Sequence, residues 1–211
     1  TIVLPPPVGE KIALAGHVWI VEEVDHKRKL IYVMLVKGNV PAFFGLCAGE
    51  INTKVLEKMN EILGSEKQYP YLMKNATVRL SQARSTAKFS QMISTPLINL
   101  GGDMWGLFPW LGSYAFLALE RFLKIKCAQS LKIKALDSSR PYFIQFKMSS
   151  SPKEFFTVLL QNANTTFDPM ELIYPNEVPF FEKYDEFLPE ELVKKGFAFG
   201  ILGIKEMIER I

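Results

Sequence analysis

Residues 130–148 read SLKIKALDSSRPYFIQFKM, and this stretch decides the fold class. Apolar and polar residues alternate on both sides of the central DSSR, as expected for half-buried strands joined by a turn. Residues 96–110, PLINLGGDMWGLFPW, show the same strand–turn–strand pattern, with a turn at Gly101–Gly102–Asp103. Two such hairpins predict antiparallel strand pairing.

Further strands are expected near the N-terminus, in HVWIVEEVD (17–25) and LIYVMLV (30–36). Their apolar residues alternate, as in Ile31, Val33 and Leu35. Helical segments follow at about 51–63, 69–88 and 152–163, between the groups of strands. This order predicts an α+β fold, with an antiparallel strand-rich sheet or partly closed barrel and packed helices.

Charge is distributed unevenly along the 211 residues. The composition, 48% apolar and 22% charged, is that of a packed globular protein. Residues 1–150 hold 19 Lys/Arg and 11 Asp/Glu, whereas residues 151–211 hold 6 and 11. We therefore expect a sheet and helix core with a basic face over 1–150, and an acidic helical portion over 151–211 packing on the same domain.

The segment 69–88, YPYLMKNATVRLSQARSTAK, contains four cationic residues and no acidic residue. Its helical spacing places small apolar side chains, including Ala83 and Ala87, on one side, where we expect a sheet to pack closely. The opposite side is cationic, and a focused cationic face attracts polyanions. The alternative to a polyanion-binding face, with equal weight, is an ordinary solvated surface whose charges are unevenly distributed.

Aromatic residues are interspersed with these positive charges. Single-stranded nucleic acid is bound by cationic grooves in which aromatic rings stack on bases. The alternative for each tryptophan is a place in the core. The residues predicted to bind nucleic acid are Arg84, Lys88, Lys74, Ser81, Lys27, Arg28 and Trp110.

Motifs for catalysis are not found in the sequence. There is no G-x-x-x-x-G-K-[ST] loop, no Gly-x-Ser-x-Gly and no His-Glu-x-x-His, and the spacing of His17, His26 and Cys47 fits no zinc site. We expect no catalytic residue, metal or cofactor in this chain. Two cysteines, no signal peptide and no apolar run of about 20 residues favour a cytoplasmic protein that does not span a membrane. The start at Thr1 suggests a piece of something longer.

Five segments together resemble a known family. They are LAGHVWIVEEVDHKRKLIYV, GEINTKVLEKMNEIL, YPYLMKNATVRLSQAR, LFPWLGSYAFLALERFL and KYDEFLPEELVKKGFA, in this order from about Ile12 to Ala198. They resemble the C-terminal region of bacterial Lhr-like (large helicase-related) DEAD/DEAH-box helicases of superfamily 2. Trp110 matches the family's W-[LA]-G-[ST] segment and Arg84 its A-R segment. His17 and Tyr114–Phe116 depart from it, because the family has basic or polar residues there.

The resemblance implies a strand-rich accessory domain that follows two RecA-like motor domains and a winged helix. In such a protein the motor domains bind ATP and Mg and hydrolyse ATP, while the accessory domain helps to grip the tracking strand. The implied partners are single-stranded nucleic acid, DNA in preference to RNA, and the motor domains of the same polypeptide.

Three other functions are compatible with the sequence. The runner-up is a protein-interaction or intramolecular docking module that uses Phe43–Phe44 and the apolar stretch FAFGILGI (197–204). A pocket for a small apolar ligand is a weaker alternative. A nucleobase hydrolase is weaker again, since no carboxylate or histidine stands out as its base.

Overall fold

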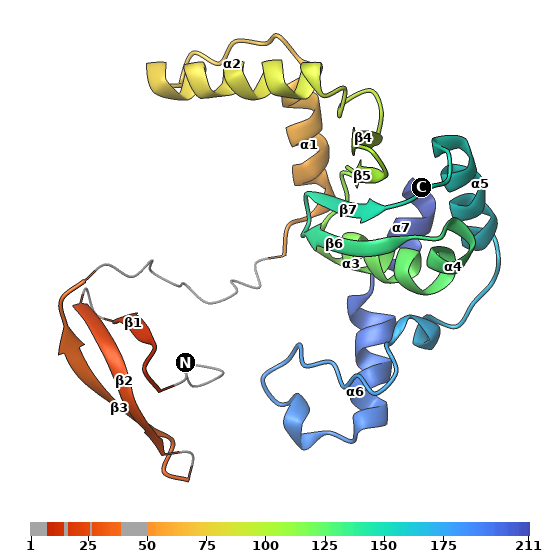
Figure 1. The fold of residues 1–211 in the computed structure, drawn as a ribbon. Helices are drawn as coiled ribbons and strands as arrows, with labels where there is room; N and C mark the ends of the chain where they lie inside the picture. The colour runs from red at the N-terminus through yellow and green to blue at the C-terminus, as the bar shows by residue number, and fades with distance from the viewer. Residues whose placement is uncertain (1–7, 15–16, 26, 39–49) are drawn as a thin grey trace. The chain divides into compact units, whose positions relative to one another are not determined.

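The computed structural model describes residues 8–14, 17–25, 27–38 and 50–211 and is drawn in Figure 1. The chain divides into two compact units, residues 1–49 and residues 50–211. The division that the charge pattern suggested, at residue 150, falls inside the second unit. Buried residues on both sides of that position, such as Phe146 and Phe155, belong to one hydrophobic core.

The first unit holds a three-stranded antiparallel sheet of β1 (Lys11–Leu14), β2 (His17–Asp25) and β3 (Leu30–Val36), in the order β1-β2-β3. The two strands predicted near the N-terminus are therefore present and pair with each other, and β1 pairs with β2. Ile31 and Val33 are half-buried as expected, but Met34 and Leu35 are both exposed, so the alternation ends after Val33.

The second unit contains the two hairpins predicted from the sequence. Their strands form one antiparallel sheet of four strands in the order β4-β5-β7-β6, in which β5 pairs with β7. The fold class is α+β, and the four-stranded sheet is open rather than closed into a barrel, since β4 and β6 are its two edges. The strands are β4 (Leu97–Gly101), β5 (Met104–Leu107), β6 (Lys134–Ser139) and β7 (Phe143–Lys147).

Helices make up most of the remainder of this unit. They are α1 (Thr53–Gly64), α2 (Lys74–Phe89), α3 (Ser113–Phe122), α4 (Ala128–Leu131), α5 (Pro152–Ala163), α6 (Glu190–Gly196) and α7 (Ile204–Arg210). Two π-helical turns, η1 (Leu123–Cys127) and η4 (Phe197–Ile201), extend α3 and α6, and short 3₁₀ turns form η2 (Pro169–Leu172) and η3 (Asp185–Phe187). None of the helices within the described residues is long and apolar enough to cross a membrane.

Helix α3 lies at the centre of the core. Every residue from Ala115 to Leu123 is buried, as expected for a helix that is apolar on nearly all sides. Ile144 and Phe146 of β7 and Phe155 of α5 belong to the same core. Burial raises the pKa of Cys127 to about 12, so this thiol stays protonated and fills space in the core.

Helix α2 packs differently from the expectation. Its close neighbour is α1, not a sheet. Ala87 is buried and Leu80 is half-buried, but Ala83 is exposed. Alanines on one side of a helix indicate that a neighbouring element approaches closely. They do not show whether that neighbour is a helix or a sheet.

Candidate nucleic-acid interface

Helix α2 and the segment before it, residues 65–73, form the surface that holds most of the predicted binding residues. Figure 1 shows α2 lying across the far end of α1. The chain leaves α1 after Gly64, passes through residues 65–73 and enters α2 at Lys74. We call residues 65–89 the cationic arm, because this segment holds five Lys/Arg and one acidic residue, Glu66.

Arg84 joins α2 to the end of α1. Its Nε donates a hydrogen bond to the Ile62 carbonyl at 3.0 Å, and its Nη2 donates to the Lys67 carbonyl at 3.0 Å and to Ser65 Oγ at 3.3 Å. A guanidinium beside the last carbonyls of a helix also interacts favourably with the helix dipole. Arg84 therefore positions residues 62–67. The three hydrogen bonds given above are all donated to groups of the protein itself.

A hollow of about 420 Å³ lies between α2 and residues 63–72. Ser81, Arg84 and Lys88 line it from α2, and Lys67 and Tyr69 line it from the preceding segment. Of the described residues that line this hollow, Glu66 is the one carboxylate. The lining is thus rich in hydroxyl donors and cations, which are the groups that contact phosphate oxygens.

Exposed aromatic rings lie on the same arm. Tyr71 is 78% exposed and Phe89 is 93% exposed, and the rings of Tyr69 and Tyr71 are 5.7 Å apart between centroids. Tyr69, Tyr71, Lys67 and Phe89 were not among the residues predicted to bind nucleic acid. The tyrosines could have been found from YPY, because they lie at the start of the stretch 69–88 without carboxylates.

The structure brings together only part of the predicted set. Ser81, Arg84 and Lys88 line the hollow, and Lys74 is exposed at the start of α2. Lys27 and Arg28 belong to the other unit, in the turn between β2 and β3, where their backbone N–H groups donate to Asp25 Oδ1 at 3.0 and 2.9 Å.

Trp110 lies just before α3 and is half-buried, and it does not line the hollow. The residues after it anchor α1. Gly112 N donates to Thr53 Oγ1 at 2.8 Å, Ser113 N donates to the Ile51 carbonyl at 2.9 Å, and Ser113 Oγ accepts from Ile51 N at 2.9 Å. The segment WLGS (110–113) therefore fixes the base of α1, and with it the cationic arm that α1 carries.

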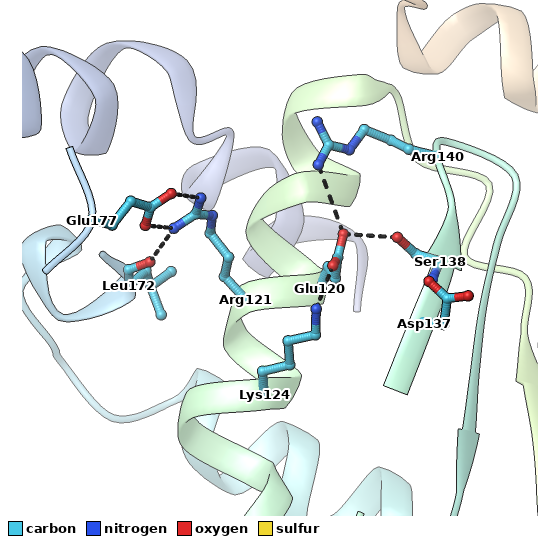
Figure 2. A network of polar contacts seen from close by, with 8 residues as sticks. All are labelled: Glu120, Arg121, Lys124, Asp137, Ser138, Arg140, Leu172 and Glu177. Carbon is cyan, nitrogen blue, oxygen red and sulfur yellow. Dashed lines mark hydrogen bonds and ion pairs between the residues drawn. The ribbon is translucent and has the colours of Figure 1, made fainter. Parts of the chain in front are cut away.

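Arg121, which is buried, forms an ion pair with the half-buried Glu177, shown in Figure 2. It donates to Glu177 Oε2 at 2.7 Å and Oε1 at 2.6 Å, and to the Leu172 carbonyl at 3.0 Å. Its guanidinium also lies 4.5 Å from the centre of the Tyr174 ring and 4.8 Å from that of Phe197. These contacts join α3 to residues 172–177 and to η4.

Glu120, the neighbouring buried carboxylate, faces the sheet (Figure 2). It accepts hydrogen bonds from Lys124 Nζ at 2.7 Å and from Ser138 Oγ at 2.9 Å, and Arg140 Nη2 lies 3.8 Å away. The partners of both charged residues are thus parts of the fold. Within the described ranges no group of three or more His, Cys, Asp or Glu could hold a metal ion.

The Glu177 carboxylate makes stability depend on pH. Its hydrogen bonds with Arg121 lower its pKa below the ordinary value of 4.5, although burial opposes this. Since the folded-state pKa is depressed, the stabilisation is complete above about pH 4.5 and is lost as pH falls through the folded pKa. We expect Glu177→Gln to be less stable than wild type at pH 7, with a difference that shrinks below pH 4.5. Urea unfolding across that range measures it, and a pH-independent difference would contradict this role.

Comparison with models of protein families, with curated proteins and with solved structures finds no match.

Proposed function

We propose that residues 50–211 form a non-catalytic accessory domain that binds single-stranded nucleic acid, DNA in preference to RNA, through the cationic arm. One observation carries the proposal: α2 contains Lys74, Arg79, Arg84 and Lys88 with no carboxylate, and Ala87 is its buried residue. Most residues of α2 are exposed, so most of its surface is available for a polyanion. A carboxylate on that surface would repel phosphates.

Two features favour a single strand over a duplex. Tyr71 and Phe89 present exposed ring faces, and such faces stack on unpaired bases with about 1–3 kcal/mol each. The hollow beside α2 has concave space between hydroxyl and cationic side chains. Bases in a duplex are already stacked on one another, so a duplex would use only the cations.

The parent protein in this proposal is a cytoplasmic DEAD/DEAH-box helicase of the Lhr-like kind, and the resemblance of the five segments supports it. ATP and Mg would bind to motor domains elsewhere in that protein. The same motor domains would be the intramolecular partner of this chain.

The docking module is less well supported by the residues first chosen for it. Within 197–204, Phe197, Ala198 and Leu202 are buried in the unit itself, and Phe199 is exposed. Phe43 and Phe44 lie outside the described residues.

Charge reversal on α2 tests the proposal. We expect Lys74→Glu combined with Lys88→Glu to weaken binding of a labelled single-stranded 20-mer by at least about tenfold, because two phosphate contacts become repulsions. The matched control reverses Lys153 and Lys205, two exposed lysines on α5 and α7, and should bind as wild type does. Fluorescence anisotropy with DNA, RNA and duplex of one sequence measures the affinities.

Removal of a ring tests the stacking. Tyr71→Ala should cost about 1–3 kcal/mol of binding free energy with the single strand, and much less with the duplex.

In the charge-reversal experiment, equal affinities for wild type and the α2 double variant would show that the cationic arm is not the binding surface. If the α2 double variant and its Lys153/Lys205 control lose the same affinity, binding depends on the overall charge of the protein and not on the cationic arm.

A further inference from the structure

An acidic surface with exposed aromatic side chains lies on residues 180–192, which we call the acidic aromatic patch. Phe180 is 68% exposed, Tyr184 is 62% exposed and Phe187 is 75% exposed. Leu188 and Leu192 are also at least half exposed. The exposed charges are Glu182, Glu186, Glu190 and Glu191 against Lys183.

The patch is built by ordered turns. Asp185 is buried, and its Oδ2 accepts hydrogen bonds from the backbone N–H groups of Phe181 and Glu182, both at 2.8 Å. Phe187 N donates to the Tyr184 carbonyl at 3.0 Å. Phe181 turns inward, with its ring centre 5.7 Å from that of Phe197. The turns thus hold Phe181 partly buried against the core and leave Phe180, Tyr184 and Phe187 exposed.

The cationic arm is complementary to this patch. Its helix carries four positive charges and no negative charge, whereas the exposed charges of the patch sum to −3, four glutamates less one lysine. Both surfaces also expose large apolar side chains, Val78 and Phe89 on α2 and Phe187 and Leu192 on the patch. Apolar anchors ringed by opposite charges are the features that stabilise and orient protein–protein contacts.

Within one copy of the 50–211 unit the two surfaces cannot meet. Figure 1 shows α2 and α6, which begins within the patch, at opposite ends of this unit. A contact between them therefore joins two copies. The contact is head-to-tail, since it uses different surfaces on the two copies, and such a contact can be repeated by further copies.

We propose that the acidic aromatic patch binds the cationic arm of a second copy of this chain, so that the protein self-associates head-to-tail. Nucleic acid on the arm then competes with the neighbouring copy for the same cations.

Sedimentation velocity of the whole chain at about 50 μM tests the proposal, a concentration suited to micromolar contacts. We expect species larger than the monomer at about 50 mM salt and their dissociation at about 500 mM, where charge attraction is screened. Phe187→Ser on the patch and Phe89→Ser on the arm should each abolish association. Leu160→Ser, at an exposed leucine on α5, is the matched control and should associate as wild type does.

A mixture of the two variants gives the decisive result. Phe187→Ser retains an intact arm and Phe89→Ser retains an intact patch, so an equimolar mixture should form a 1:1 pair that neither variant forms alone. Glu186→Lys, which changes charge without removing a ring, should behave as Phe187→Ser does. A monomer at both salt concentrations, or no pair in the mixture, would overturn the proposal. The partner of the patch would then be a different protein. Both of these results concern self-association alone. Oligonucleotide binding by the monomer is measured separately, so this proposal can fail while the proposed function holds.

Discussion

Replacement of Arg121 by Met is expected to lower the free energy of unfolding of the 50–211 unit by about 3–5 kcal/mol, since it leaves a carboxylate without its partner in a largely buried site. Arg121 and Glu177 form the bidentate pair, with side chains 7% and 23% exposed. The substitution also removes the hydrogen bond to the Leu172 carbonyl.

Urea unfolding followed by tryptophan fluorescence measures this effect. A Trp19→Phe background leaves Trp105 and Trp110, both in the 50–211 unit, as the reporters. The double variant Arg121→Met with Glu177→Leu should recover part of the loss, because no unpaired charge then remains. A loss below about 1 kcal/mol, the size typical of an exposed pair, would mean that this ion pair does not hold the core together.

Gly112→Ala is expected to lower the same free energy by about 1–3 kcal/mol, as insertions into packed interiors do. A Cβ at this position would lie 2.6 Å from the Ile51 carbonyl oxygen and 2.6 Å from Thr53 N. Both contacts are backbone atoms, which cannot rotate away. The base of α1 would have to move away from α3.

Gly200→Ala is the matched control, because a Cβ there meets nothing within 4 Å. Its stability should be unchanged or slightly raised, since alanine restricts the unfolded chain. Thermal unfolding of the two variants beside wild type provides the comparison. If Gly112→Ala is as stable as Gly200→Ala, the close approach of α1 to α3 is not what positions the cationic arm.

The hairpins could be predicted because strand alternation and turn residues are local signals. Gly101 and Gly102 adopt positive φ at 123° and 58° in the turn between β4 and β5, as expected for glycines in a tight turn. The start of α2 was placed too early, at about residue 69, because Pro70 is favourable in a first helical turn. The helix begins only at Lys74, after Met73 in an extended conformation.

The candidate site was harder to predict, because its residues are combined by tertiary packing. Arg84 was expected to contact phosphate since no carboxylate lies near it in sequence, yet the carbonyls of Ile62 and Lys67 accept its hydrogen bonds. Backbone acceptors at a helix end are not visible in a charge count. The unit boundary between Gly49 and Glu50 was not predicted, because the charges were counted over residues 1–150 as a whole.

The affinity of the whole chain for a single-stranded oligonucleotide between about 50 and 200 mM salt tests the central claim most directly. Lys67, Lys74, Arg79 and Lys88 are the exposed cations of the arm. If these four neutralise phosphates, the logarithm of the association constant should fall against the logarithm of salt with a slope of about −3, from roughly −0.7 per contact. Lys74→Glu with Lys88→Glu should reduce that slope by about half. Binding whose affinity does not change with salt, or a slope that the double variant leaves intact, would contradict a nucleic-acid interface on α2.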